Sequence, residues 1–189
     1  MKASRALFPL AALAATLASA PREARAVERQ HHIGVDPNIT ILDVDDKSTL
    51  DVGVGVNAHY TYGITDQFLF MGELGGAIVA LDQKQDTPKT PHTRPSEVDH
   101  VALGAGYVLD VLQFVPYGGV LLGGYRLAGG TLDSALFLPG VELTLGLDYL
   151  LARHIAIGFA YQQHMLVTKM STYPVLSSVL LRAEYVWGF

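Results

Sequence analysis

The sequence predicts an all-β fold, an eight-stranded antiparallel up-and-down transmembrane β-barrel. Half of the 189 residues are hydrophobic, yet beyond residue 26 no run of about 18 apolar residues could cross a bilayer as a helix. The longest stretch there without acidic, basic or histidine residues is Val111 to Tyr125, and a proline and four glycines interrupt it. The dominant pattern alternates with period two. A closed barrel explains both observations, because one face of each strand meets lipid and the other lines the interior.

Residues 1–26 are predicted to be a cleaved secretory signal peptide. A positively charged start precedes the uncharged segment Ala6–Ala18, and small residues follow. Cleavage can follow Ala20 or Ala26, and Ala26 is favoured because a proline follows Ala20. The barrel domain is therefore predicted to span residues 27–189.

Charge and cysteine content exclude two classes of protein. Loss of residues 1–26 removes four positive charges and one negative charge, which changes the net charge from −5 to −8. An acidic chain argues against nucleic acid as a partner. The chain has no cysteine, which excludes a disulfide-stapled secreted fold.

The first three strands are predicted before the longest hydrophilic segment. One lies around Ile33 to Asp43, and its Pro37 is expected at a strand end or a bulge because proline lacks an amide donor. In the next, residues 49–62, apolar or aromatic residues alternate with Asp, Gly, Asn, His and Thr. Its length suits a tilted membrane strand. In residues 68–81, Glu73 marks the inner face.

Five further strands complete the predicted barrel, at residues 100–110, 117–128, 140–150, 155–162 and 179–189. The alternation is clear in all except the second, where Arg126 is assigned to the inner face. The alternation also turns His100, like His59 of the strand at 49–62, toward the interior. The last strand turns Tyr185, Trp187 and Phe189 outward and turns Arg182 and Glu184 inward. The total is even, as single-chain bacterial barrels require.

The connections alternate in length, which is typical of membrane barrels. Short turns are predicted at 63–67, 111–116 and 150–154, and longer loops at 82–98, 128–138 and 167–174. The first outer connection, 43–49, is short for a loop. Aromatic residues flank the short turns and predict a girdle at one membrane interface: Tyr62 and Phe68, Tyr107 and Tyr117, and Tyr149 and Phe159.

Several segments resemble small bacterial outer-membrane β-barrel proteins, the group that includes barrels of the OmpA and OmpW types. They are YGITDQFLF, YVLDVLQFVPYGG, LDYLLARHIAIGFAY and the terminal AEYVWGF. The resemblance implies a place in the bacterial outer membrane, among lipid and lipopolysaccharide. It also implies that Tyr185, Trp187 and Phe189 form a C-terminal signal that the barrel-assembly machinery reads.

Charged residues on the predicted inner face are expected to form one polar cluster. The lumen of an eight-stranded barrel is just filled by side chains, and buried charges there must be paired. Arg126 and Glu142 are expected to meet across neighbouring strands. The alternative is a narrow ion path. The predicted cluster comprises Glu73, Arg126, Glu142, Arg182 and Glu184.

The sequence predicts no catalytic, metal or cofactor site. The histidines are scattered and none has the helical spacing of a zinc protease. Some outer-membrane barrels are enzymes that modify lipid A with a His and a Ser close together on one strand. Here Met165 and Leu166 follow His164, and Ser171 lies in a loop, so nucleophile and base are not adjacent.

The predicted function is non-enzymatic: a structural role in the envelope or the presentation of surface loops. A narrow channel for small solutes is the alternative. A lipid A-modifying barrel and a soluble lipocalin-like ligand binder are weaker alternatives. The lipocalin Gly-x-Trp is absent, and apolar residues face outward instead of inward. The oligomeric state stays open.

Overall fold

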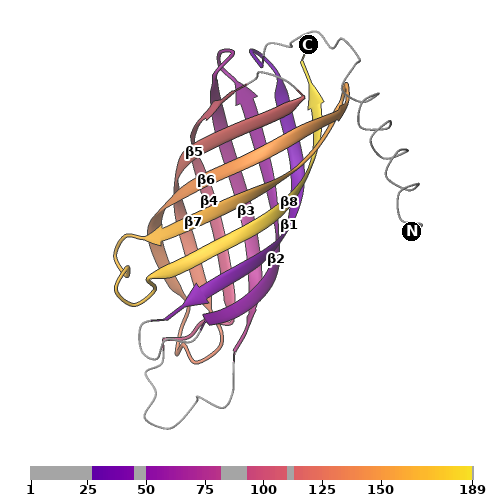
Figure 1. Ribbon diagram of the computed structural model, residues 1–189. Helices are drawn as coiled ribbons and strands as arrows, with labels where there is room; N and C mark the ends of the chain where they lie inside the picture. The colour runs from indigo at the N-terminus through magenta and orange to yellow at the C-terminus, as the bar shows by residue number, and fades with distance from the viewer. Residues whose placement is uncertain (1–26, 45–49, 82–92, 110–112, 189) are drawn as a thin grey trace, which may run out of the picture.

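The computed structural model describes residues 27–44, 50–81, 93–109 and 113–188. Eight strands form a closed barrel in which each strand is antiparallel to its neighbours in chain order (Figure 1). This confirms the predicted fold. The strands are β1 (His31–Asp43), β2 (Leu50–Gly63), β3 (Phe68–Ala80), β4 (Glu97–Val108), β5 (Phe114–Ala128), β6 (Leu136–Ala152), β7 (Ile155–Leu166) and β8 (Val175–Trp187).

The last strand closes the barrel against the first. The β1–β8 register runs from His31 opposite Trp187 to Asp43 opposite Val175. The start of β1 and the end of β8 therefore lie at one end of the barrel, which we call the termini end (Figure 1). The connections β2–β3, β4–β5 and β6–β7 lie at this end. The other four connections lie at the opposite end, which we call the loop end.

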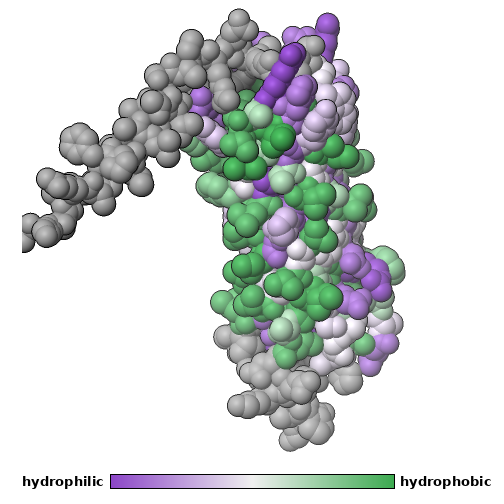
Figure 2. Space-filling view, turned by 90° about the vertical axis from the view of Figure 1, so that its right-hand side faces the viewer, coloured by the Kyte–Doolittle hydropathy of each residue, from purple (hydrophilic) through white to green (hydrophobic). Residues whose placement is uncertain are grey.

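The outer surface of the barrel is apolar. Large hydrophobic side chains alternate along every strand and stay exposed, for example Val54 at 67%, Leu122 at 68% and Ile78 at 69%. Hydrophobic side chains cover most of the face seen in Figure 2. An apolar surface of this extent suits lipid rather than water. In the part of the chain that is described, no helix is long and apolar enough to cross a membrane.

Pro37 lies in the middle of β1, so the prediction of a strand end or a bulge is wrong. It stands opposite Val56 of β2. Between β1 and β8 the register is the same on both sides of it, with Val35 opposite Ala183 and Asn38 opposite Leu180, and the pairs at Asp36 and Pro37 are skipped. The missing amide thus interrupts the ladder locally, while the flanking pairs keep the register.

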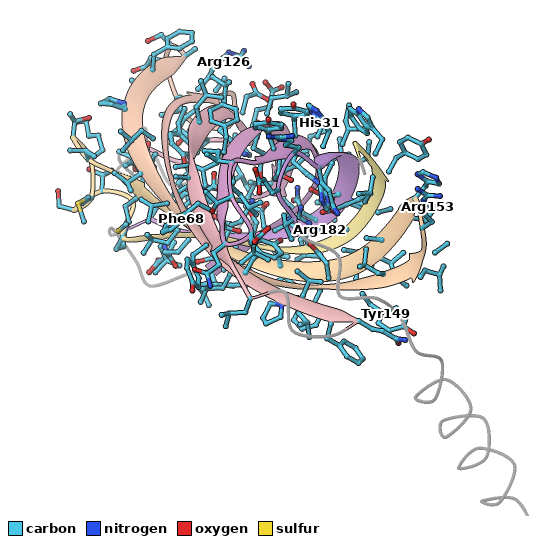
Figure 3. The ribbon with its side chains drawn as sticks, turned by 90° about the horizontal axis from the view of Figure 1, so that it is seen from above. His31, Phe68, Arg126, Tyr149, Arg153 and Arg182 are labelled. Atoms are coloured by element: carbon cyan, nitrogen blue, oxygen red, sulfur yellow. The ribbon has the colours of Figure 1, made fainter. Side chains whose placement is uncertain are left out.

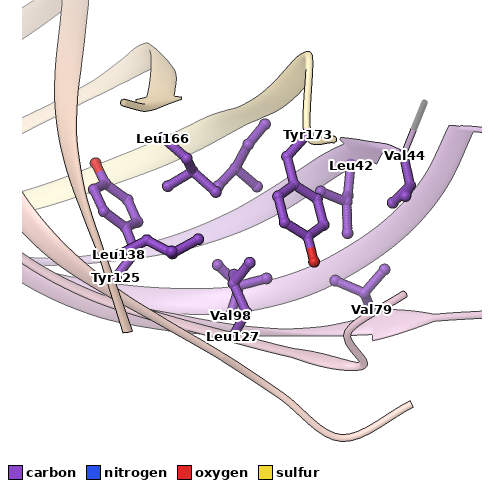
Figure 4. Packing of buried hydrophobic residues seen from close by; sticks show 10 residues of the cluster. Leu42, Val44, Val79, Val98, Tyr125, Leu127, Leu138, Leu166 and Tyr173 are labelled. Carbon is purple, nitrogen blue, oxygen red and sulfur yellow. The ribbon is translucent and has the colours of Figure 1, made fainter. Parts of the chain in front are cut away.

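Apolar side chains fill the lumen near the loop end (Figure 4). We call this group the apolar plug, and it consists of Leu42, Val44, Val79, Val98, Tyr125, Leu127, Leu138, Leu166, Tyr173 and Leu176. Burial raises the pKa of Tyr173 to about 12, so its hydroxyl stays protonated and donates to the Thr93 carbonyl oxygen at 2.8 Å. This bond ties the β7–β8 loop to the segment before β4.

Close approach of strands explains some of the glycines and yields a first prediction. A Cβ at Gly104 would lie 2.1 Å from the Val120 carbonyl oxygen, whereas one at Gly124 would meet nothing within 4 Å. Because backbone cannot yield as a side chain does, Gly104→Ala should lower the free energy of unfolding by about 1–3 kcal/mol. Gly124→Ala should leave it unchanged or raise it by up to about 1 kcal/mol. Urea unfolding of both variants in detergent checks this, and equal effects would contradict it.

Candidate functional site

Polar side chains fill the barrel interior between the two ends and form two groups. We call the first the Arg182 cluster; it lies toward the termini end and contains His32, Asp36, His59, Tyr117, Asp148, Arg182 and Glu184. We call the second the Glu73 cluster; it lies nearer the plug and contains Asn57, Glu73, His100, Tyr125, Glu142, Gln162 and His164.

Arg182 of β8 is the centre of the first cluster. Its side chain projects into the ring of strands (Figure 3), and the residue is 6% exposed. The guanidinium donates to Glu184 from Nε at 3.1 Å and to the Tyr117 hydroxyl, and lies 4.7 Å from the centre of the Tyr117 ring. Nη2 is 2.8 Å from His59 Nε2, and Nε is 3.7 Å from Asp148. The Arg182 guanidinium therefore lies beside two carboxylates, those of Glu184 and Asp148.

The Arg182 cluster spans the junction of the first and last strands. His59 of β2 donates from Nδ1 to Asp36 of β1 at 2.6 Å. His32 of β1 donates from Nδ1 to Glu184 of β8 at 2.9 Å. These buried contacts link β1, β2 and β8 through side chains at the level where the β1–β8 ladder skips Asp36 and Pro37.

Glu73 of β3 organises the second cluster. Its Oε1 accepts hydrogen bonds from Asn57 at 2.6 Å and from His100 Nε2 at 2.9 Å. Its Oε2 accepts one from Gln162 at 2.6 Å. Four strands therefore converge on one carboxylate, which is 9% exposed.

Glu142 of β6 lies beside this network. It is fully buried, and neither carboxylate oxygen has a hydrogen-bond partner among the described residues. The nearest basic group is His164, whose Nδ1 lies 3.6 Å away and 3.0 Å from the Tyr125 hydroxyl. A small cavity bounded in part by His100, Tyr125 and His164 has room for about one water molecule.

Arg126 lies on the outer face, so its predicted place in the lumen is wrong (Figure 3). Its guanidinium pairs with Asp99 at 2.5 Å and Glu97 at 3.6 Å on β4, and its side chain is 42% exposed. Its partner in the β5–β6 register is Phe137 rather than Glu142, so the predicted contact between Arg126 and Glu142 is also wrong. The other predicted interior residues, Glu73, Glu142, Arg182 and Glu184, lie inside the barrel.

Aromatic side chains gather around the termini end. Ring contacts join Phe68 to Tyr107 and Phe114 to Tyr149, and Tyr185 stacks on Trp187. Tyr117 does not belong to this girdle, contrary to prediction, because it points inward and contacts Arg182. Of the predicted C-terminal signal, Tyr185 and Trp187 lie at the end of β8, and Phe189 lies outside the described residues.

Four interior histidines had no predicted role. His32, His59, His100 and His164 lie inside the barrel and contact carboxylates. The alternation already placed His59 and His100 on the inner face, but only the strand register shows which residues they meet. Ser171 lies in the exposed β7–β8 loop, while His164 is buried in the lumen, so this pair has no catalytic geometry.

The arrangement is a lumen filled by side chains at successive levels. The apolar plug occupies the loop end, and the two polar clusters occupy the middle. Near the termini end a second apolar group, which includes Val27, Leu69, Val108 and Tyr117, packs inside the wall. Side chains packed at each of these levels favour a rigid, filled barrel over a lumen through which solutes pass.

Comparison with known proteins agrees with the architecture. The model of the outer membrane protein beta-barrel domain matches residues 10–174. Ail of Yersinia pestis, 14% identical, has a TM-score of 0.59 over 85% of this chain and 99% of that chain. Neisserial surface protein A, 16% identical, also has a TM-score of 0.59, over 84% and 97%.

OprG of Pseudomonas aeruginosa, 12% identical, has a TM-score of 0.56 over 89% of this chain and all of that one. No curated protein matches the chain. At these identities the solved structures agree in fold alone, while the family model covers most of the sequence. The chain therefore belongs to the outer membrane protein beta-barrel domain family and lies in the bacterial outer membrane.

Proposed function

We propose that this protein is a non-enzymatic component of the envelope, with a closed lumen and a role in envelope structure or in surface contacts made by its loop end. The filled lumen is the observation that carries the proposal. Leu127, Leu166 and Leu176 of the plug are each at most 1% exposed. A barrel closed in this way leaves its outer wall and its loops as the surfaces that meet other molecules.

Bilayer recording tests the closed lumen. Purified protein in planar membranes should show no steady conductance. Steady, reproducible conductance steps would overturn the proposal in favour of the narrow channel. Lipid A is the second readout, because overexpression should leave its mass spectrum unchanged. An altered mass would indicate an enzyme.

The proposal includes how the protein reaches the membrane. Residues 1–26 act as a cleaved signal peptide, and Tyr185, Trp187 and Phe189 act as the signal for the barrel-assembly machinery. The mature barrel then sits among outer-membrane lipid and lipopolysaccharide. The apolar outer face and the aromatic girdle support this environment. N-terminal sequencing of the mature protein distinguishes cleavage after Ala20 from cleavage after Ala26.

Phe189→Asp is expected to lower the amount of folded barrel in the outer membrane, because it replaces the closing aromatic of the signal with a charge. Phe189→Tyr, which keeps an aromatic ring, should assemble normally. Folded barrel is measured by its shifted migration on unheated gels. Normal levels of the Asp variant would show that the terminal aromatic is not part of the signal.

A further inference from the structure

Three side chains of the Glu73 cluster are placed like the ligands of a metal ion. One donor atom each from Glu73 of β3, His100 of β4 and Glu142 of β6 lies within 4.8 Å of the other two. Ligand atoms held at about 2.0–2.2 Å from Zn²⁺ lie roughly 3–4 Å apart, so side-chain shifts of roughly 1 Å would close the site.

Glu142 provides an independent reason to expect a ligand. It is 0% exposed, and neither of its oxygens accepts a hydrogen bond in the described structure. A buried carboxylate needs a proton or a cation beside it. His164 does not meet this need, because its Nδ1 is 3.6 Å from the Glu142 carboxylate and forms its 3.0 Å hydrogen bond with the Tyr125 hydroxyl instead.

We propose that Glu73, His100 and Glu142 bind a divalent transition-metal ion inside the barrel. The ion places a positive charge beside the Glu142 carboxylate, which accepts no hydrogen bond from the described residues. It takes the place of the proton with which His100 Nε2 donates to Glu73 Oε1 at 2.9 Å. A cavity that His100 lines, but Glu73 and Glu142 do not, has room for about one water molecule near the proposed site.

The surroundings hold the proposed ligands in place. Asn57 and Gln162 both donate to Glu73 at 2.6 Å, which fixes the carboxylate as outer-shell partners do in metal sites. The His100 ring stacks on Tyr125, with centroids 5.7 Å apart and an interplanar angle of 19°. The ligands therefore lie on three strands of a rigid wall and do not depend on loops.

The donor set selects the class of metal. Two carboxylates and one imidazole suit Zn²⁺, and related ions such as Mn²⁺, Fe²⁺ and Co²⁺. Ca²⁺ and Mg²⁺ prefer sites made of oxygen alone. The spacing of histidines along the chain did not indicate this site, because its ligands come from strands that only the barrel register brings together.

Refolding with metal tests the proposal. The full chain without a polyhistidine tag is unfolded with a chelator, then refolded in detergent with Zn²⁺ or Co²⁺ and passed through a desalting column. Metal retained per folded barrel is measured by mass spectrometry, and the Co²⁺ absorption spectrum reports nitrogen and oxygen ligands. Wild type should retain about one ion per barrel, the number that a single mononuclear site holds.

Matched variants locate the ion. Glu142→Gln and His100→Gln should reduce the retained metal by at least about tenfold, the lower limit seen even for outer-shell partners. Gln162→Met, which removes one donor to Glu73, should weaken binding by about 10–100-fold. Glu97→Gln on the outer wall and His31→Gln at the termini end should retain metal as wild type does.

Each outcome decides the proposal. Folded wild-type protein that retains no Zn²⁺ or Co²⁺ would overturn it and leave a proton as the partner of Glu142. Equal loss from Glu97→Gln or His31→Gln would assign the metal to the surface and overturn it as well. If Glu142→Gln does not fold, unchanged metal affinity in the folded Gln162→Met variant would also overturn it. None of these readouts depends on conductance or lipid A chemistry, so the closed-lumen proposal is tested separately.

Discussion

Replacing Arg182 with Met is expected to lower the free energy of unfolding by about 3–5 kcal/mol. The substitution removes the cation that contacts Glu184 and lies 3.7 Å from Asp148, and both carboxylates stay buried. Met fills much of the same volume, so the loss reflects removal of the guanidinium charge from beside the two carboxylates rather than an empty cavity. Equilibrium urea unfolding in detergent, followed through the fluorescence of the single Trp187, measures it.

Arg126→Met is the matched control. It deletes the same charge from the outer wall, where the Arg126 side chain is 42% exposed and its partner Asp99 is 48% exposed. Exposed pairs contribute only about 0–1 kcal/mol, so this variant should unfold close to wild type. Equal losses from the two variants would mean that burial of the Arg182 cluster does not determine stability.

Tyr125→Ala is expected to cost about 3–5 kcal/mol, as truncation of a large buried ring does. The Tyr125 side chain is 2% exposed and belongs to the apolar plug. It also stacks on His100 and bonds to His164. Tyr125 therefore belongs to both the apolar plug and the Glu73 cluster. Removal of its ring leaves a cavity that the His100 and His164 side chains cannot fill.

Tyr107→Ala is the control on the lipid face. Its ring is 41% exposed and meets Phe68 edge to face at 5.4 Å, a contact that contributes about 0.5–1.5 kcal/mol. Lipid can occupy the space that the ring leaves, so this variant should lose no more than about that amount. The same urea titration compares both variants, and a Tyr125→Ala loss as small as that of Tyr107→Ala would contradict tight packing of the plug.

The architecture was predictable because alternation is a local signal. In β2, every second side chain from Leu50 to Tyr62 carries the same character, so one face can be read without knowing any neighbour. In β5 the rule weakens, because Tyr117, Leu121 and Tyr125 point inward although they are large and apolar. Arg126 was then the only charge available as a guide, and it was misassigned for that reason.

The site was less predictable because it depends on register. Glu73, His100 and Glu142 were all placed on the inner face from the sequence, yet nothing in the sequence says which of them share a level. Glu73 faces Ala102 in the ladder and reaches His100 only by the diagonal contact between their side chains. Such diagonal contacts follow from strand tilt and side-chain length, which the pattern of one strand does not contain.

The closing pair of strands also sets the order of folding. His31 and Trp187 stand opposite each other although 156 positions separate them in the chain. Bringing such distant segments together costs about 2 kcal/mol more conformational entropy than closing a ten-residue hairpin. We therefore expect the β1–β8 junction to form last, after the hairpins. Because β1 and β8 carry Asp36 and Glu184, this final step is also the one that takes their charges out of water.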